Sequence, residues 1–512
     1  MAKAVTLAAV LFCSGVQTAS IPRSSLGPVL SELFMRQVEV PLDYGEPSRG
    51  VTAIAFLKLS ATNATSNTRS FPINQGGPGG SGIESVFSQG AALAGILQGR
   101  HNIVGFDPRG VGRSGPSVDC WPGNPEGRAQ FEKLYYPEIY NASSTSAGRQ
   151  SAAAEIFGHA CSSTVGGSNG SAAFVSTPAV AHDMLSFVEA EQKQRLAENE
   201  SYNEQAMRWY YGVSYGTVLG ATFEHLFPDK VERMVLDGVV DAEDYYSLGW
   251  RSNLYDADKA LESFIQSCFQ AGESCAFWGP SVQNIRSRLD ALRQDLKYNP
   301  ISIAPSVTTC PLPMLATYSD LKQLIFQAMY VPTERFPNLA AILAGLEQGN
   351  TTVYAIAVTG GTIPANPCNY ALSTATTDVD TLIKCVDGAG ERQFRDISQF
   401  EDYADVLTSQ SEAFEVSPPE SGKPKGSILD SRHTASPILF VTTELDPVAP
   451  KRGAYKMSSV FPGSAVLTQH SVGHTAFLNP SSCFAQRARN YLLSGKLPPP
   501  NSTCQADAEP FR

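Results

Sequence analysis

The chain lacks an excess of basic residues. Its 512 residues contain 38 Lys and Arg against 49 Asp and Glu, which gives a formal net charge of −11 at pH 7. Proteins that bind nucleic acid usually present a basic face, so this acidic balance argues against such a partner. The cysteines include no CxxC pair, which makes a zinc site improbable. We expect neither a metal nor an organic cofactor.

Long apolar runs are also missing beyond the N-terminus. Residues 1–20 read MAKAVTLAAVLFCSGVQTAS, in which Lys3 precedes the apolar run Ala4–Phe12 and small residues follow. This arrangement predicts a secretory signal peptide over 1–20, with cleavage near Ala19–Ile21. A buried N-terminal helix is the alternative. No later run is long and apolar enough to cross a membrane.

Two further counts favour a secreted, extracellular glycoprotein. Six N-x-[ST] sequons occur, at Asn63, Asn141, Asn169, Asn199, Asn350 and Asn501. Nine cysteines follow Cys13, which in an oxidising compartment predicts four disulfides and one odd thiol. Proximity along the chain favours the pairs Cys120–Cys161, Cys268–Cys275, Cys368–Cys385 and Cys483–Cys504, and leaves Cys310 odd.

Short apolar runs that end in turn residues predict strands. They are Val51–Leu59, Ser70–Asn74, Asn102–Phe106, Met207–Val213, Arg233–Val240, Pro437–Thr443 and Ser464–His470. Runs that are nearly continuous in apolar residues are typical of a mostly parallel sheet buried on both faces. Helical patterns lie between several of them, at Pro178–Lys193 and Tyr215–Phe227. Strands that alternate with helices predict an α/β fold.

The strand rhythm stops between Asp241 and Ser436. Helical patterns occur there instead, at Ala257–Gln270, Val282–Leu296, Tyr318–Met329 and Leu339–Gly349. We therefore expect a core over 21–240, a large and mainly helical cap insertion over 241–436, and the last core strands with the C-terminal tail over 437–512. Pro418–Ser427 is expected to be an exposed loop, and the tail after Lys496 an irregular segment held by Cys504.

The pattern GxSxG occurs twice, in different surroundings. GVSYG at Gly212–Gly216 lies between a predicted strand and a predicted helix, whereas GGSNG at Gly166–Gly170 lies in a polar stretch typical of a surface turn. A serine on a sharp strand-to-helix turn is the nucleophile of α/β-hydrolases. Ser214 is therefore the predicted nucleophile, and the Tyr215 N–H an expected oxyanion donor. The alternative is a buried serine in a glycine-lined turn.

A serine needs a base, and in this fold the histidine comes last in the chain. Four histidines follow Ser214. His225 falls within the predicted helix and His433 precedes a strand. His474 is favoured over His470, because the glycine before it lets the loop carry the imidazole over the sheet.

The acid should follow a strand and hold the imidazole in one tautomer. Asp446, in ELDPVAP, has that position. Asp237 is the rival, with a structural role at the cap hinge as its alternative. For the second oxyanion donor, the glycine-rich loop FPINQGGPGGSG offers Gly77, with Gly76 as the alternative.

Six blocks in order, GGPGGSG, GFDPRGVGRS, YYGVSYGTVLG, FPDKVERMVLDGVVD, ELDPVAP and GHTAF, resemble the secreted tripeptidyl/prolyl aminopeptidase-like (TAP-like) hydrolases of fungi and actinobacteria. The resemblance spans about residues 40–490 and implies an α/β-hydrolase fold with the triad Ser214, Asp446 and His474. The acid block commonly reads DPVTP in such proteins, and here Ala449 replaces the threonine.

The resemblance also implies a serine exopeptidase that releases tripeptides or single residues from a free N-terminus. Carboxylates in the cap of such enzymes usually bind the substrate's ammonium group. The candidates here are Glu444, Asp241 and Glu243, followed by Glu84 and Asp244. A carboxylesterase or amidase acting on a small molecule is the alternative function. A binding protein on an inactive hydrolase scaffold is a third hypothesis, against which the intact triad argues.

Overall fold

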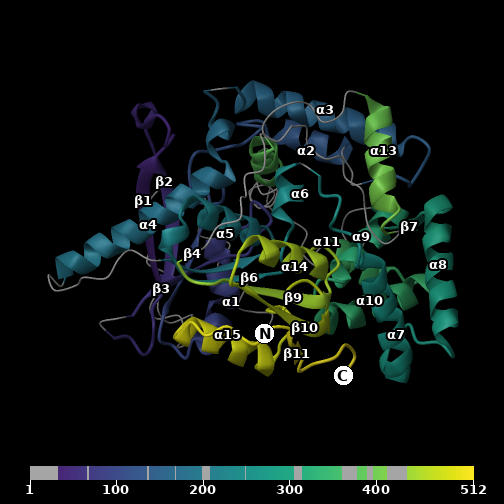
Figure 1. The fold of residues 1–512 in the computed structure, drawn as a ribbon. Coiled ribbons are helices and arrows are strands. Elements are labelled where there is room, and N and C mark those ends of the chain that lie inside the picture. Colours follow the sequence, from purple (N-terminus) through teal and green to yellow (C-terminus); the bar gives the residue numbers. More distant parts are fainter. Residues whose placement is uncertain are drawn as a thin grey trace.

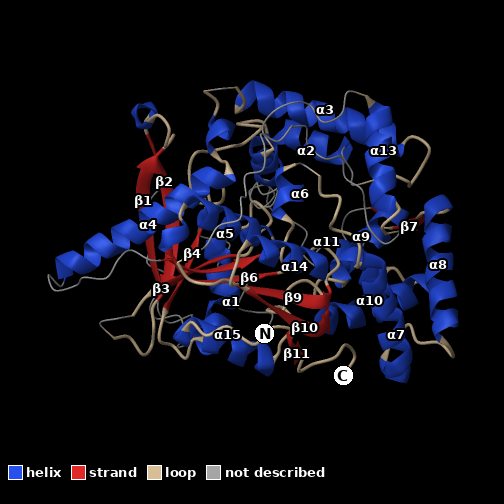
Figure 2. Ribbon diagram, viewed as in Figure 1, coloured by secondary structure: helices blue, strands red, loops and turns tan. Residues whose placement is uncertain are grey.

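The computed structural model describes residues 33–65, 68–134, 138–167, 169–198, 208–247, 249–304, 314–359, 378–388, 396–411 and 435–512. A nine-stranded sheet crosses its centre, with helices on both faces (Figures 1 and 2). The strand order is β1-β2-β4-β3-β5-β6-β9-β10-β11. Only the β1–β2 and β2–β4 pairs of this sheet are antiparallel.

This order and the single reversed strand near one edge are those of an α/β-hydrolase, as predicted. The strands are β1 (Leu33–Pro41), β2 (Val51–Leu59), β3 (Ser70–Asn74), β4 (Asn102–Phe106), β5 (Arg208–Val213), β6 (Val231–Asp237), β9 (Leu439–Leu445), β10 (Ala465–Val472) and β11 (Ser502–Gln505). A separate antiparallel pair joins β7 (Ile301–Ile303) to β8 (Met314–Ala316).

Helices connect the strands and cover the sheet. The helices are α1 (Gly82–Ile96), α2 (Pro125–Leu134), α3 (Ser146–Thr164), α4 (Thr177–Glu198), α5 (Tyr215–Leu226), α6 (Ala242–Tyr246), α7 (Ala257–Ala271), α8 (Val282–Tyr298), α9 (Tyr318–Ala328), α10 (Pro332–Glu347), α11 (Thr352–Thr359), one over 378–387, α13 (Ile397–Thr408), α14 (Lys451–Val460) and α15 (Ser482–Ser494). Single 3₁₀ turns lie at Pro47–Arg49, Ser171–Phe174, Pro228–Lys230 and Gly272–Ser274.

The sheet is buried on both faces because successive side chains of a strand point in opposite directions. In β6, Val235 packs with α1 and α15, while the next residue, Leu236, packs with α5 and α14. In β9, Leu439 lies on the same face of the sheet as Val235, and Phe440 on the same face as Leu236. This explains why the strands read as nearly continuous apolar runs.

A second core lies outside the sheet. Helices α7 to α11 pack on one another around Phe264, Leu321 and Phe336, all fully buried. We call α7–α11 with β7 and β8 the helical region; it lies between β6 and β9 in the chain. Helix α13 lies next to α3, which belongs to the connection between β4 and β5 (Figure 1).

Three of the four predicted disulfides are present: Cys120–Cys161, Cys268–Cys275 and Cys483–Cys504. Of the fourth pair, Cys385 lies in the helix over 378–387, whereas Cys368 is outside the described residues, as is Cys310.

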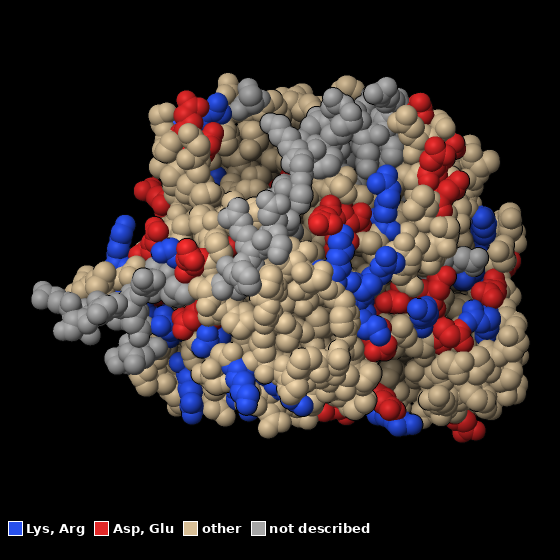
Figure 3. Space-filling view, in the orientation of Figure 1, with Lys and Arg blue, Asp and Glu red and all other residues tan. Residues whose placement is uncertain are grey.

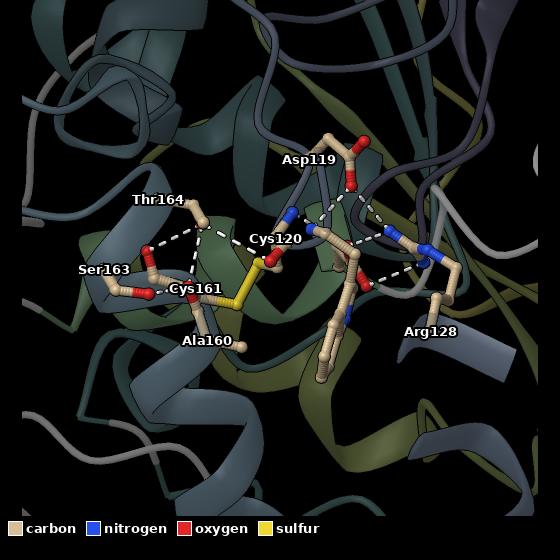
Figure 4. The surroundings of a disulfide bond; sticks show 9 residues. Asp119, Cys120, Arg128, Ala160, Cys161, Ser163 and Thr164 are labelled. Carbon is tan, nitrogen blue, oxygen red and sulfur yellow. Dashed lines mark hydrogen bonds and ion pairs between the residues drawn. A yellow bond between two sulfur atoms is a disulfide. The ribbon is translucent and has the colours of Figure 1, made fainter. Parts of the chain in front are cut away.

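Cys120 ties the segment ahead of α2 to α3 (Figure 4). Beside this disulfide, Arg128 donates to Asp119 at 2.9 Å and also pairs with Asp378, at the start of the helix over 378–387. The Cys120 N–H donates to the same Asp378 carboxylate at 3.2 Å. The disulfide therefore lies where three separate chain segments meet.

The predicted leader lies outside the described residues. Five of the six sequon asparagines, all but Asn199, are described, and each is exposed, so their glycosylation stays a prediction. Acidic and basic side chains are interspersed on the face seen in Figure 3. Within the described part of the chain, no helix has the length and hydropathy of a membrane span.

One prediction about the tail is wrong. Cys504 does hold it, through its disulfide to Cys483, but Ser502–Gln505 forms β11 rather than an irregular segment. It pairs in parallel with β10, with Gln469 opposite Cys504. The loop expected at 418–427 lies outside the described residues.

Candidate active site

Ser214 lies on the turn between β5 and α5, with φ 56° and ψ −125°. A residue other than glycine rarely adopts this backbone conformation, so neighbouring contacts must hold Ser214 in it. The Ser214 N–H donates to the Asp237 carbonyl at 3.0 Å, and the Thr217 N–H donates to the Ser214 carbonyl at 2.8 Å. A Cβ on Gly216 would lie 2.5 Å from the Asn74 carbonyl oxygen, which explains the glycine at that position.

His474 and Asp446 are in direct contact. The imidazole Nδ1 lies 2.9 Å and 3.0 Å from the two carboxylate oxygens of Asp446. The N–H groups of Val448, Ala449 and Thr475 also donate to this carboxylate, at 3.0, 2.9 and 3.2 Å. Asp446 is fully buried and His474 is 5% exposed. The hydrogen bonds keep the carboxylate fixed against the imidazole.

The residue pair Asp237–Gly238 borders both Ser214 and His474. The Asp237 carbonyl accepts from the Ser214 N–H, and a Cβ on Gly238 would lie 3.1 Å from Cε1 of His474. The absence of a side chain at Gly238 therefore leaves room for the imidazole beside the serine turn. The three candidate triad residues follow the carboxyl ends of β5, β9 and β10, which lie at the same end of the sheet because these strands run parallel.

The rival acid, Asp237, occupies a different position from Asp446. Its carboxylate accepts from the Ala476 N–H at 2.9 Å, the Phe477 N–H at 3.0 Å and the Tyr211 hydroxyl at 2.7 Å. Burial raises the pKa of this carboxyl to about 6, although these hydrogen bonds and the nearby His474 act in the opposite direction. Asp237 therefore binds the backbone that follows His474, and Asp446 binds its ring.

The glycine loop after β3 approaches the serine turn closely. A Cβ on Gly76 would lie 2.9 Å from the Tyr215 nitrogen and 2.5 Å from the Val213 carbonyl oxygen. Gly76 and Gly77 have φ of 92° and 113°, and the Gly76 N–H donates to the Asn74 side chain at 2.9 Å. The loop thus brings the Gly77 segment beside the N-terminus of α5, where the Tyr215 N–H lies.

The helical region contributes Tyr330, which the sequence analysis missed. The Tyr330 carbonyl accepts from the His474 N–H at 2.9 Å, and its ring lies edge-on to the imidazole with centroids 5.1 Å apart. A Cβ on Gly473 would lie 2.9 Å from the Tyr330 carbonyl oxygen, so the glycine before His474 permits this contact. No motif around Tyr330 marks it, because the contact forms only when the helical region meets the sheet.

A buried polar cluster links the helix over 378–387 to the residue after the serine. Asp387 accepts from the Thr177 N–H at 2.6 Å and the Tyr245 hydroxyl at 2.8 Å. The Thr177 hydroxyl in turn bonds to the Tyr215 hydroxyl. Burial raises the pKa of Asp387 to about 6. No motif in the sequence predicts this cluster, because it draws on four distant segments.

Four of the five predicted ammonium-binding carboxylates have a cationic partner within the chain, whereas the fifth, Asp244, accepts from the N–H and the hydroxyl of Ser252 at 2.8 and 2.7 Å. Lys456 contacts Asp241 at 2.7 Å and Glu243 at 2.8 Å, and Lys451 pairs with Glu444. Glu84 lies 3.7 Å from Arg113. The negative charge of these groups is partly neutralised, and their role toward a substrate stays a prediction.

The remaining candidates lie apart from this arrangement. His470, the alternative base, is exposed and lies 3.5 Å from Glu444. His225 lies on α5, while His433 and Ser168 are outside the described residues. No group of three His, Cys, Asp or Glu side chains suited to a metal ion occurs in the described segments.

A sequence model of the TAP-like protein family matches residues 415–504. Three relatives match far more of the chain. Serine protease Hip1 of Mycobacterium tuberculosis is 27% identical over 91% of this chain and 86% of its own length. Tripeptidyl aminopeptidase of Streptomyces lividans is 27% identical over 92% of this chain and 84% of its own length. Carboxylesterase B of Mycobacterium tuberculosis is 25% identical over 91% and 85%. The predicted resemblance is confirmed, and the chain is an α/β-hydrolase similar to the TAP-like proteins.

Proposed function

We propose that the protein is a secreted serine hydrolase that cleaves amide bonds through an acyl-enzyme, with Ser214, His474 and Asp446 as its triad. One observation carries the proposal: the Nδ1 of His474 lies 2.9 Å from the Asp446 carboxylate, beside a serine held at φ 56°. A serine becomes nucleophilic when an adjacent base is itself oriented by a third group.

The chemistry follows from these positions. Ser214 Oγ attacks the substrate carbonyl carbon while its proton passes to Nε2 of His474, and Asp446 stabilises the imidazolium. The N–H groups of Gly77 and Tyr215 donate to the oxyanion. The C–N bond then breaks, and the leaving amine takes the proton from His474. Water attacks the acyl-enzyme by the same route and releases Ser214.

Within this reaction class, we propose an aminopeptidase that releases tripeptides or N-terminal residues from peptides. Two relatives that match most of the chain, named serine protease Hip1 and tripeptidyl aminopeptidase, support this choice. An ammonium-binding carboxylate would have to exchange its lysine partner for the substrate, as Glu444 could do with Lys451.

Paired substrates test the proposal. The protein should hydrolyse tripeptidyl or prolyl arylamides and should lose at least tenfold in kcat/KM on the N-acylated versions. A fluorophosphonate probe should label the wild type and fail to label Ser214→Ala. Absence of labelling in the folded wild type would refute the serine mechanism, whereas equal rates on free and blocked substrates would refute only the aminopeptidase assignment.

A carboxylesterase or small-molecule amidase is the second candidate. Two observations favour it: a relative named carboxylesterase B matches 91% of this chain, and three of the predicted ammonium-binding carboxylates are paired with lysines. Short acyl esters and peptide arylamides, assayed on one preparation, distinguish the two candidates. A kcat/KM ratio that favours the ester beyond its greater intrinsic reactivity, with no preference for a free amine, would select the esterase.

Secretion is part of the proposal. Three disulfides, five exposed sequon asparagines and the leader-like residues 1–20 support it. Expression of the full chain in a eukaryotic secretory host should yield a protein in the medium that begins near Ser20. A glycosidase that removes N-glycans should lower its apparent mass.

A further inference from the structure

The Asp237 carboxylate lies next to the triad but is not a member of it. It is fully buried at the end of β6, and both of its oxygens are engaged: one accepts from the Ala476 N–H, the other from the Phe477 N–H and the Tyr211 hydroxyl. Ala476 and Phe477 follow His474 by two and three residues. Through them, the carboxylate fixes the backbone just beyond the imidazole.

The groups that face Asp237 come from three elements. Tyr211 of β5 donates to it, the loop after β10 brings two N–H groups and the His474 ring, and Asp446 after β9 lies across that ring. The attraction to His474 favours the charged form of Asp237. A carboxylate at this position therefore stabilises the imidazolium that forms during the reaction.

We propose that Asp237 is a positioning residue that must be ionised: it fixes the loop of His474 through Ala476 and Phe477 and adds negative charge beside the imidazole. The inference rests on the proposed triad. Asp237 is then neither the catalytic acid nor a structural residue at the hinge of the predicted cap.

Protonation should disable the contact. A protonated carboxyl would carry no charge and would turn one oxygen into an O–H donor, so the charge-assisted hydrogen bonds from the two loop N–H groups would weaken. A general base acts only in its unprotonated form, and protonation of Asp237 should add a second loss of activity as the pH falls. The acid limb of the kcat/KM profile should therefore depend on two protons rather than one.

Asp237→Asn is the first test. Its side-chain NH₂ would replace an acceptor oxygen next to the N–H of Ala476 or Phe477 while the shape is retained. We expect kcat to fall about 10- to 100-fold, since a small displacement of a catalytic group has effects of this size, with KM changed less than threefold. The acid limb of the kcat/KM profile should then depend on one proton instead of two, and it should move to lower pH.

Tyr211→Phe keeps the inference testable if Asp237→Asn does not fold. The Tyr211 hydroxyl stabilises the ionised carboxylate, so its removal should raise the pKa of Asp237 further. The acid limb should then move to higher pH, the opposite direction from Asp237→Asn, with a threefold or smaller loss of kcat on the plateau.

Asp320→Asn is the matched control, because Asp320 is another buried carboxylate that accepts from a tyrosine hydroxyl, that of Tyr354 at 2.8 Å. It caps α9 in the helical region. This variant should lose thermal stability without any change in the shape of the pH profile.

The outcomes separate the inference from the proposed function. A wild type that is folded, inactive and not labelled by a fluorophosphonate would refute the triad itself. If the wild type is active and labelled, the inference would be refuted by a folded Asp237→Asn protein whose kcat stays within twofold of the wild type and whose acid limb is unchanged. An unmoved acid limb in Tyr211→Phe would likewise refute it.

Discussion

The two sides of His474 are held by different parts of the molecule and by different kinds of contact. On the sheet side, Asp446 contacts its ring and Asp237 binds the backbone beyond it, both through buried carboxylates. On the side of the helical region, Tyr330 supplies one carbonyl and the edge of one ring.

The difference separates two tasks. Charged hydrogen bonds to buried carboxylates are strong and directional, so the sheet side can set the tautomer and the orientation of the imidazole. One neutral hydrogen bond and one ring contact contribute less, about 1 kcal/mol each. We infer that the sheet side determines whether the reaction occurs, and that the helical region adjusts access and rate.

The largest effect should come from the sheet side. Ser214→Ala and His474→Ala each remove a reacting group, so kcat/KM should fall about 10⁴-fold or more, and Asp446→Asn about 10⁴-fold. Initial rates on one arylamide or ester measure this. Ser168→Ala, in the second GxSxG pattern, is the matched control and should stay within twofold of the wild type. A Ser214→Ala protein with more than a tenth of wild-type activity would exclude the triad.

The glycine loop should give the next largest effect. At Gly76, a Cβ would clash with the Val213 carbonyl and the Tyr215 nitrogen, so Gly76→Ala should displace the proposed oxyanion donors. Loss of one such donor costs about 10²- to 10³-fold in kcat. Gly50→Ala is the control, because Gly50 has a similar φ of 116° but no atom within 4 Å of its added Cβ. Equal kcat values for the two variants would show that this loop does not serve the reaction.

The side of the helical region should give a smaller effect. Tyr330→Ala removes the ring against His474 but keeps the backbone carbonyl, and an aromatic pair of this kind is worth about 0.5–1.5 kcal/mol. We expect kcat/KM to fall about 3- to 10-fold. Tyr298→Ala, at a tyrosine that is 73% exposed, should leave the rate unchanged. A loss of 10³-fold or more in Tyr330→Ala would contradict the division of tasks described above.

The same division explains what could be predicted from the sequence. In β2, β3 and β4, the predicted bounds match the structure, because burial on both faces leaves an unbroken apolar run between turn residues. The positions of Ser214 and Asp446 at the ends of β5 and β9 can be predicted because each depends on the element directly before it. The prediction of a strand over Arg233–Val240 is two residues late at the start and three at the end, since β6 spans Val231–Asp237.

What could not be predicted depends on contacts between distant segments. Tyr330 meets His474 across 144 residues of chain, and Asp237 meets Ala476 across 239. The edge strand β1 was missed because most of its side chains are exposed, so it has no apolar run. The start of α10 was missed because prolines at 332 and 337 lie within it, although Pro332 occupies the first turn, where its missing N–H costs nothing.

The smallest effect on catalysis should come from loosening the helical region within itself. Cys268→Ser with Cys275→Ser opens a disulfide that spans a separation of 7 residues, which should lower the free energy of unfolding by about 2 kcal/mol. The disulfide lies within the separate core of α7–α11, which meets His474 through Tyr330 and the sheet through contacts of α7 with β9. Because neither cysteine belongs to the proposed site, we expect kcat to stay unchanged at a temperature where the variant is folded. Thermal unfolding without reductant measures the first effect and initial rates the second. If kcat fell together with stability, the helical region would determine the geometry of the reacting groups as much as the sheet does, through Tyr330 or through the contacts of α7 with β9.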